Sequence, residues 1–280
     1  MVKGLEMILE EYVNKVAGVF MLPDTCFKVK ELMEDGRSSS DDFAEVISVD
    51  PIMTSNLLRI ANSSIYNFSR EISTISRAIT IVGSSAIYNM MMVTFASDTI
   101  KAFSTTAIDL NRFWRTSVFC GVVAKNLSIC AGIRDRERMF VVGLMQNLGE
   151  LVVAKFQPEL AKEIEKLESD VLPWDKQQST VGFHYADLTA KLLKAWCIPE
   201  KIILPIKHFN QAESIQLNKD IKILHIASRL ALVDSHPELY SRAELVCEDM
   251  CRGIDIPLKD INTAYEYAAK ETQGIITLIS

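Results

Sequence analysis

Residues that interrupt regular secondary structure are scarce in this chain. It contains 11 glycines and 8 prolines in 280 residues, against usual frequencies of about 7% and 5%. Long regular segments are therefore expected, because glycine weakens helices and strands and proline ends them. The sequence also lacks a useful run of alternating apolar and polar residues and has no repeat at a fixed spacing. These two absences argue against a β-sheet fold and against a repeat fold.

A surplus of positive charge is absent as well. The chain has 30 basic and 36 acidic residues, a net charge of −6, and residues 211–280 hold 11 acidic and 7 basic residues. Binding through the phosphates of nucleic acid requires a basic surface, so no direct nucleic-acid partner is expected.

No targeting or membrane segment stands out. The first 15 residues are charged throughout and contain no apolar signal-peptide core. Residues 78–97 carry no charge, but their serines, threonine and asparagine favour a buried helix over a membrane span. We expect a soluble, cytoplasmic protein that binds no membrane.

Common catalytic motifs are missing too. The sequence contains no C-x-x-C pair among its six cysteines, no G-x-x-x-x-G-K-[ST] phosphate loop, no G-x-G-x-x-G, no H-E-x-x-H and no G-x-S-x-G. The cysteines are interpreted as packed thiols in a reducing compartment. A Ser/His/Asp site formed only in space stays open, with four histidines available.

Apolar residues recur at every third or fourth position through most of the chain, which predicts helices and an all-α fold. Asp50 and Pro51 are typical of a helix N-terminus, and Gly143 and Gly149 would permit close packing. The expected helices cover residues 5–20, 27–33, 40–47, 51–61, 72–79, 87–95, 113–127, 139–156, 221–233 and 265–275. The alternating charges of residues 134–138 predict a solvated loop.

Several separately spaced segments, in this order, resemble the HDOD domain, a bacterial signalling module related to HD-type metal-dependent phosphohydrolases. They are Asp50-Pro51, LLRIANSSIYN (57–67), ISTISRAITIVG (72–83), FWRTS (113–117), GLMQNLG (143–149), VGFHYA (181–186), AWCIP (195–199) and IKH (206–208). The resemblance implies an HDOD domain over residues 14–212, with a first helical lobe to about 110 and an HD-like lobe after it. Residues 213–280 would then form an acidic, helical C-terminal extension packing on the HD-like lobe.

The resemblance also implies where a metal site would lie. The active HD enzymes bind metal through a His, a His-Asp pair and a later Asp. The flanking motifs place these ligands at Thr116, at Gln146 and Asn147, and at Ser228, which we call together the vestigial HD pocket. Uncharged amides and hydroxyls cannot replace the anionic ligands that offset the desolvation of a divalent cation. We therefore expect no metal, no cofactor and no catalysis, with Gln146 and Asn147 as hydrogen-bonded amides.

The resemblance singles out further residues. His184 and His208 match family positions and are expected to cap helices or face solvent, although they and Arg115 are also candidates for ligand contact. His225 is expected to be a satisfied core histidine. The turn of Asn62, Ser63, Ser64 and Tyr66 is the candidate partner surface.

The function expected from this resemblance is non-catalytic bacterial signal transduction through contacts with other signalling proteins. Two alternatives are weighed against it: binding of a nucleotide in the vestigial HD pocket, and residual metal-dependent phosphohydrolase activity. The identity of the partner and the oligomeric state stay open.

Overall fold

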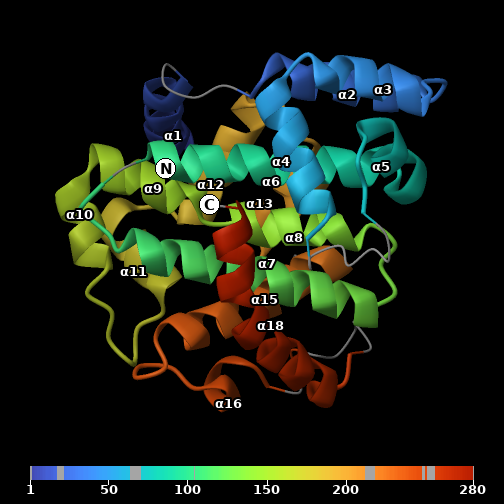
Figure 1. Ribbon diagram of the computed structural model, residues 1–280. Coiled ribbons are helices and arrows are strands. Elements are labelled where there is room, and N and C mark those ends of the chain that lie inside the picture. Colours follow the sequence, from blue (N-terminus) through green and yellow to red (C-terminus); the bar gives the residue numbers. More distant parts are fainter. Residues whose placement is uncertain are drawn as a thin grey trace. The chain divides into compact units, whose positions relative to one another are not determined.

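The computed structural model of the chain describes residues 2–17, 22–63, 71–103, 105–211, 218–247, 250 and 256–279. Every regular element in these ranges is a helix, and none is a strand (Figure 1). The all-α fold is thereby confirmed. Contacts divide the chain into two compact units: a larger unit of residues 1–21 and 100–272, and a smaller unit of residues 22–99 and 273–280.

The smaller unit is built from short amphipathic helices with well-defined N-termini. Asp50 caps one of them as expected: its Oδ1 accepts a hydrogen bond of 2.9 Å from the Met53 N–H, and Pro51 occupies the first helical position. The helix expected from residue 40 is capped by Ser39, which forms a reciprocal capping box with Asp42. The helices of this unit are α2 (Asp24–Asp35), α3 (Ser40–Ser48), α4 (Pro51–Ala61), α5 (Ile75–Val82) and most of α6 (Ser84–Ala102).

The larger unit surrounds α7, a helix with a buried face along most of its length. Helix α7 packs against both α8 and α15, and α12 packs against α1, α9 and α13 (Figure 1). The helices of this unit are α1 (Val2–Ala17), α7 (Leu110–Cys130), α8 (Arg136–Met145), α9 (Leu148–Phe156), α10 (Pro158–Ile164), α11 (Pro173–Val181), α12 (Tyr185–Ala195), α13 (Glu200–His208), α15 (Lys219–Ser235), α16 (Arg242–Leu245) and most of α18 (Leu258–Ile279).

Glycines set the closest helix contacts of the larger unit, as the sequence predicts. A Cβ atom on Gly143 would lie 2.6 Å from the Cα of Gly121, so α7 and α8 approach each other backbone to backbone. A Cβ on Gly149 would lie 2.4 Å from the carbonyl oxygen of Tyr185, and the Gly149 N–H donates to Thr189 Oγ1 at 2.8 Å. These contacts hold α8 against α7, and α9 against the start of α12.

The single helix expected over residues 139–156 is wrong in one respect. The chain forms two helices, α8 and α9, and leaves the helical ladder at Gln146 and Asn147. Asn147 has φ −116° and ψ 20° and occupies the N-cap position of α9, although its side chain makes no capping hydrogen bond to the backbone. The apolar spacing runs on through this break without a proline, so periodicity alone does not reveal it. The break turns two polar residues out of the regular helix, next to the cavity described below.

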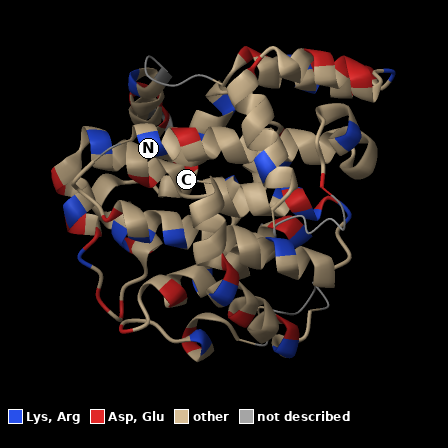
Figure 2. Ribbon diagram, viewed as in Figure 1, with Lys and Arg blue, Asp and Glu red and all other residues tan. Residues whose placement is uncertain are grey.

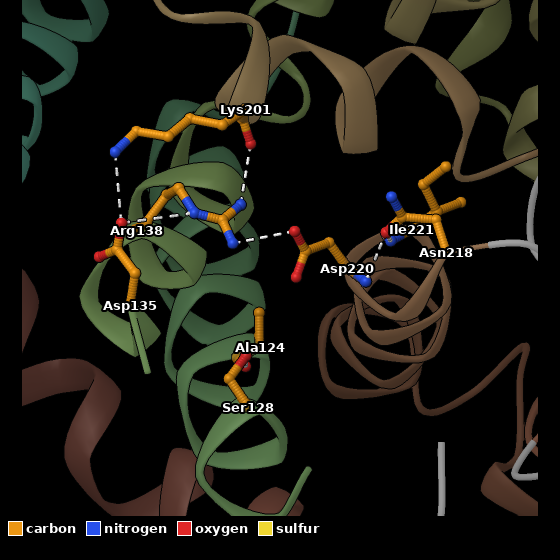
Figure 3. Close-up of polar contacts among 8 residues, drawn as sticks. All are labelled: Ala124, Ser128, Asp135, Arg138, Lys201, Asn218, Asp220 and Ile221. Atoms are coloured by element: carbon orange, nitrogen blue, oxygen red, sulfur yellow. Dashed lines mark hydrogen bonds and ion pairs between the residues drawn. The ribbon is translucent and has the colours of Figure 1, made fainter. Parts of the chain in front are cut away.

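The solvated loop expected at residues 134–138 is also wrong. Helix α8 begins at Arg136, and the side chain of Arg138 is only 8% exposed. Its guanidinium donates to the carbonyl oxygen of Lys201 at 2.8 Å and to Asp220 Oδ2 at 2.9 Å (Figure 3). Asp135 lies 3.6 Å from the same guanidinium. Charge alternation here therefore reflects a network that joins the N-terminal ends of α8, α13 and α15.

One stretch, residues 136–156, is long and apolar enough by composition to cross a membrane, and the bent pair α5 and α6 would pass the same test if counted as one span. In the stretch 136–156, 78% of the most apolar window is buried within the protein. This burial is typical of a core helix in a soluble protein.

Candidate functional site

A cavity of about 110 Å³ lies in the larger unit, and all four residues of the vestigial HD pocket line it. Thr116 comes from the second turn of α7, Gln146 and Asn147 from the break between α8 and α9, and Ser228 from the middle of α15. The structure thus brings together positions separated by 112 residues (228 − 116) in the sequence. The backbone break at 146–147 is the local feature that allows both amides to reach one cavity.

The polar side chains of the vestigial HD pocket are only partly satisfied by the protein. Ser228 Oγ donates to the carbonyl oxygen of His225 at 3.0 Å, and Asn147 Nδ2 donates to Glu150 Oε2. The side chains of Thr116 and Gln146 form no hydrogen bond with the described residues. Gln146 is 6% exposed. The expectation of a hydrogen-bonded amide holds for Asn147 and stays a prediction for Gln146.

Four Arg, Glu and His residues that the sequence analysis missed also line the cavity: Arg112, Glu150, Glu165 and His236. Arg112 forms an ion pair with Glu165. Sequence spacing could have indicated two of the four. Arg112 precedes Thr116 by one helical turn, and Glu150 follows Asn147 by three residues in the first turn of α9. Glu165 and His236 carry no such signal.

Burial shapes the charge state of the cavity. It raises the pKa of Glu150 to about 7, although Arg112 and the hydrogen bond from Asn147 lower it in part. Burial also lowers the pKa of His236, and the positive charge of Arg112 acts in the same direction. At neutral pH, His236 is therefore uncharged while Glu150 is close to half-ionised.

Arg115, expected as a possible ligand contact, is not among the residues that line the cavity. Its guanidinium binds Asp234 in a bidentate pair, with Nε to Oδ2 at 2.7 Å and Nη2 to Oδ1 at 3.0 Å. This pair joins α7 to the end of α15. The donors of Arg115 bind Asp234, so its ligand contact stays a prediction without support from the structure. Arg112, one turn earlier, lines the cavity instead.

His184 and His208 lie outside the cavity lining as well. His184 is the N-cap residue of α12, with its N–H donating to Asp187 Oδ2 at 3.2 Å. His208 lies at the end of α13, with Nδ1 2.6 Å from Gln211 Oε1. The capping interpretation is confirmed for His184, and the possible ligand contact is supported for neither.

His225 is a satisfied core histidine, as expected. Its Nδ1 lies 2.7 Å from the carbonyl oxygen of Phe209. Burial, with a contribution from neighbouring Arg229, lowers the pKa of His225 to about 4. Arg229 in turn stacks over Trp174, with 4.5 Å between the guanidinium carbon and the ring centre. Trp174 lines the cavity, so the stacking of Arg229 helps to hold a residue of the cavity wall in place.

The candidate partner surface is described only at Asn62 and Ser63, and Ser64 and Tyr66 lie outside the described residues. Asn62 closes the end of α4 by three bonds: Nδ2 donates to the carbonyl oxygens of Leu58 and Ile72 at 2.8 Å, and Oδ1 accepts from the Ile72 N–H at 2.7 Å. Ser63 is 8% exposed. These two side chains are engaged within the protein, so the partner role of this turn stays a prediction without support from them.

A comparison with known families places the chain. The HDOD domain profile matches residues 19–212, more than half of the sequence. The chain belongs to the HDOD domain family. The resemblance drawn from the separate motifs is confirmed, and the matched range starts five residues (19 − 14) after the expected start and has the same end.

Relatives of this HDOD protein are distant. A Treponema pallidum (strain Nichols) protein is 26% identical over 203 residues, a match that covers 70% of this chain and only 39% of that protein. A solved HDOD domain structure from Geobacter sulfurreducens has a TM-score of 0.75 at 19% identity, with 99% of each chain covered. A structure from Shewanella amazonensis SB2B, described as a candidate phosphohydrolase, has a TM-score of 0.69 at 20% identity and covers 96% of this chain and 98% of its own. These structural likenesses establish the fold.

The HD-type enzymes related to this family use a metal, and the residues present here do not suit one. Among the described residues, no group of three or more His, Cys, Asp or Glu side chains lies close enough to hold a metal ion. The positions of the vestigial HD pocket are two amides and two hydroxyls, which carry no charge and bind transition metals weakly. Glu150 is the nearest acidic residue in sequence to this set, and its carboxylate is already bonded to Asn147.

Proposed function

We propose that this HDOD protein is a non-catalytic regulator in bacterial signal transduction that acts in the cytoplasm through contacts with other proteins. The observation that carries the proposal is the chemistry of the cavity, where Thr116, Gln146, Asn147 and Ser228 stand together at the positions expected for metal ligands. Family membership supports the signalling part of the proposal. The net charge of −6, with basic and acidic residues interspersed along the helices (Figure 2), supports leaving nucleic acid out as a partner.

A metal-loading experiment tests the non-catalytic part. The protein is incubated with Mg²⁺, Mn²⁺, Fe²⁺ or Co²⁺, desalted and measured for metal content and for phosphomonoester and phosphodiester hydrolysis. We expect far less than one metal per chain and no metal-dependent turnover. Stoichiometric metal with turnover would establish the residual phosphohydrolase alternative instead.

A ligand-restored variant serves as the matched control for that experiment. It combines Thr116→His, Gln146→His, Asn147→Asp and Ser228→Asp, which returns the expected ligand set. If the four positions are the lost metal site, the variant gains Mn²⁺, detected as a rise in melting temperature on addition of the metal. A folded variant that gains none would show that the positions were assigned incorrectly.

The nucleotide alternative is not favoured by the cavity. Pockets for drug-sized ligands and cofactors measure about 300–1,000 Å³, whereas this cavity measures about 110 Å³. Arg115, the residue expected to contact a phosphate, is bound to Asp234.

A surface on the smaller unit offers a place for a partner. Val49 and Ile52 are 79% and 73% exposed and flank the Asp50-Pro51 corner between α3 and α4. Two large apolar side chains held this close together at the surface are the kind of feature that protein contacts use.

Capture with matched baits tests this surface. We expect a wild-type bait to retain specific bacterial signalling proteins, and a Val49→Ser, Ile52→Ser bait to lose them without a change in melting temperature. Met7→Ser is the control, because Met7 is 70% exposed on the larger unit. Equal capture by all three baits would place the contact elsewhere, and no specific capture by the wild type would contradict the protein-binding role.

A further inference from the structure

Oxygen atoms without a protein partner gather on the wall of the cavity. Asn210 Oδ1 is buried and has no hydrogen-bond partner, and Asn210 lines the cavity. The amide of Gln146, a residue 6% exposed, bonds to no described residue. The hydroxyl of Thr116 also bonds to no described residue. Asn210 Oδ1 is a buried atom that lacks the usual pairing. Gln146 and Thr116 add an amide oxygen and a hydroxyl oxygen that can accept from a guest with hydrogen-bond donors.

Among the charged residues of the cavity wall, Glu150 is the acid that forms no ion pair with a described residue. Arg112, from α7, is the only Lys or Arg among the lining residues, and its ion pair is with Glu165, which follows α10. Glu150, from α9, receives a hydrogen bond from the amide of Asn147. The other titratable residues of the wall, Tyr185 from α12 and His236 after α15, are both uncharged at neutral pH because burial raises the pKa of Tyr185 and lowers the pKa of His236. When Glu150 is ionised, the wall therefore carries one net negative charge.

Size and apolar surface narrow the class of guest. The volume of about 110 Å³ admits a molecule of only a few heavy atoms. The cavity is also lined by three aromatic side chains that could contact a short hydrocarbon part of the bound molecule: Phe113, Trp174 and Phe209. A compact molecule with a donor-rich positive end and a short apolar end satisfies all of these conditions.

We propose that this cavity binds a small primary ammonium compound, whose positive end bonds to cavity oxygens that include the carboxylate of Glu150. The site goes beyond the proposed function, since it requires no protein partner and uses a residue outside the expected metal-ligand set. An ammonium group donates three hydrogen bonds and accepts none, which matches a wall of carboxylate, amide and hydroxyl oxygens.

Binding of a cation is linked to the ionisation of Glu150. The cation favours the carboxylate, so binding releases a proton below the pKa of about 7. The ionised fraction rises about tenfold between pH 6 and pH 8 for a group with that pKa. The affinity for the ammonium compound is therefore expected to rise by about the same factor over this range.

Ethylammonium chloride is the probe for the test, with ethanol as the uncharged molecule of equal size and sodium chloride as the salt control. We expect ethylammonium to raise the melting temperature of the full chain above its value in equal sodium chloride, and more strongly at pH 8 than at pH 6. Ethanol should give no such rise. If ethylammonium and sodium chloride act alike at every pH, the cavity holds water only and the proposal is overturned.

Two variants separate the cavity from the surface. Glu150→Gln keeps the shape and removes the charge, and should abolish the difference between ethylammonium and sodium chloride. Glu45→Gln removes an exposed acid outside the cavity lining and should preserve the difference. Gln146→Met, which removes an amide at nearly constant volume, should weaken binding and gives a second test if Glu150→Gln folds poorly. Retention of the full ethylammonium effect in both cavity variants would contradict the site, while the metal and partner experiments would be unaffected.

Discussion

Gly143 and Gly121 lie where α8 and α7 approach each other most closely, and they give the sharpest prediction at the scale of single residues. Gly143→Ala places a Cβ 2.6 Å from the backbone of Gly121, which cannot move as a flexible side chain could. We expect a loss of about 2–3 kcal/mol in the free energy of unfolding, from overpacking, measured by urea denaturation.

A third glycine provides the control for that substitution. A Cβ on Gly274, within α18, meets no atom within 4 Å. Gly274→Ala should therefore leave stability unchanged or raise it by about 0.5–1 kcal/mol, because alanine favours a helix over glycine. Equal destabilisation by both substitutions would show that helix α7 does not approach α8 as closely as described.

Glu150 predicts a particular dependence of stability on pH. Its folded-state pKa of about 7 lies above the ordinary value of 4.5, so the folded state binds its proton more tightly than the unfolded state does. Stability from this group is present below about pH 4.5 and is lost as pH rises to 7. The displacement corresponds to an upper limit of about 3 kcal/mol, at about 1.36 kcal/mol per pKa unit.

The measurement compares urea unfolding of the wild type and Glu150→Gln from pH 5 to pH 8. The difference between the two proteins should move in favour of Glu150→Gln as pH rises, because glutamine has no charge to bury. The buried histidines cancel in this difference, since both proteins contain them. A difference that stays constant across the range would contradict the raised pKa.

At the scale of single residues, the sequence predicted the uncharged side chains of the cavity and missed the charged ones. Thr116, Gln146, Asn147 and Ser228 could be located because flanking motifs mark their positions, and the structure brings them to one cavity. Glu150 and Arg112 were missed because a single acid or base on an amphipathic helix looks like any surface residue. Their spacing from Asn147 and Thr116 places them on the same helix faces as those residues, and the packing of α9 and α7 brings both side chains to the cavity.

At the scale of elements, helix positions followed from apolar spacing, while their ends depended on local chemistry. Asp50-Pro51 predicted the start of α4 correctly, because cap and proline act within a few residues. The break at Gln146 and Asn147 and the burial of Arg138 were not predicted, because both depend on contacts from distant elements. The partner of Arg138, Asp220, lies 82 residues away in the sequence.

The network around Arg138 gives the prediction for this scale. Arg138→Ala leaves Asp220 and the Lys201 carbonyl without their shared donor at the junction of three helices (Figure 3). Removing one partner of a buried pair destabilises by about 3–5 kcal/mol, and the part-exposed Asp220 makes the lower end the expected result. Arg134→Ala, at an exposed position four residues earlier, should change the free energy of unfolding by less than about 0.5 kcal/mol.

Conservative replacement distinguishes shape from charge in the same network. Arg138→Lys keeps the charge but loses the planar fork that reaches two acceptors at once. We expect Arg138→Lys to lower the free energy of unfolding by about half as much as Arg138→Ala does. Full stability in the lysine variant would show that a point charge is enough at this junction.

At the scale of the whole molecule, contacts assign the last residues of the chain to the smaller unit, although they follow the larger unit directly in sequence. Ile275 and Ile279 of α18 are 5% and 3% exposed, and the Ile279 carbonyl oxygen accepts a hydrogen bond of 2.6 Å from Ser97 Oγ. Apolar spacing predicted a helix over 265–275, and the observed helix extends to Ile279. Its membership of the smaller unit could not be predicted, because it depends on a contact across 182 residues.

A truncation after Thr272 tests this assignment. It removes two buried isoleucines from the smaller unit, each contributing about 1.5–3 kcal/mol on burial, and it removes the partner of Ser97. Hydrogen exchange should show faster exchange at residues 22–99, with protection in α7, α8 and α15 of the larger unit retained. Replacing Thr277 and Gln273 with alanine in the full-length chain is the control, since Thr277 Oγ1 bonds only the carbonyl oxygen of Gln273 in an exposed pair. Loss of a segment that belongs to one unit should lower hydrogen-exchange protection in that unit alone. Faster exchange spread evenly over both units would therefore mean that the last residues of α18 also stabilise the larger unit.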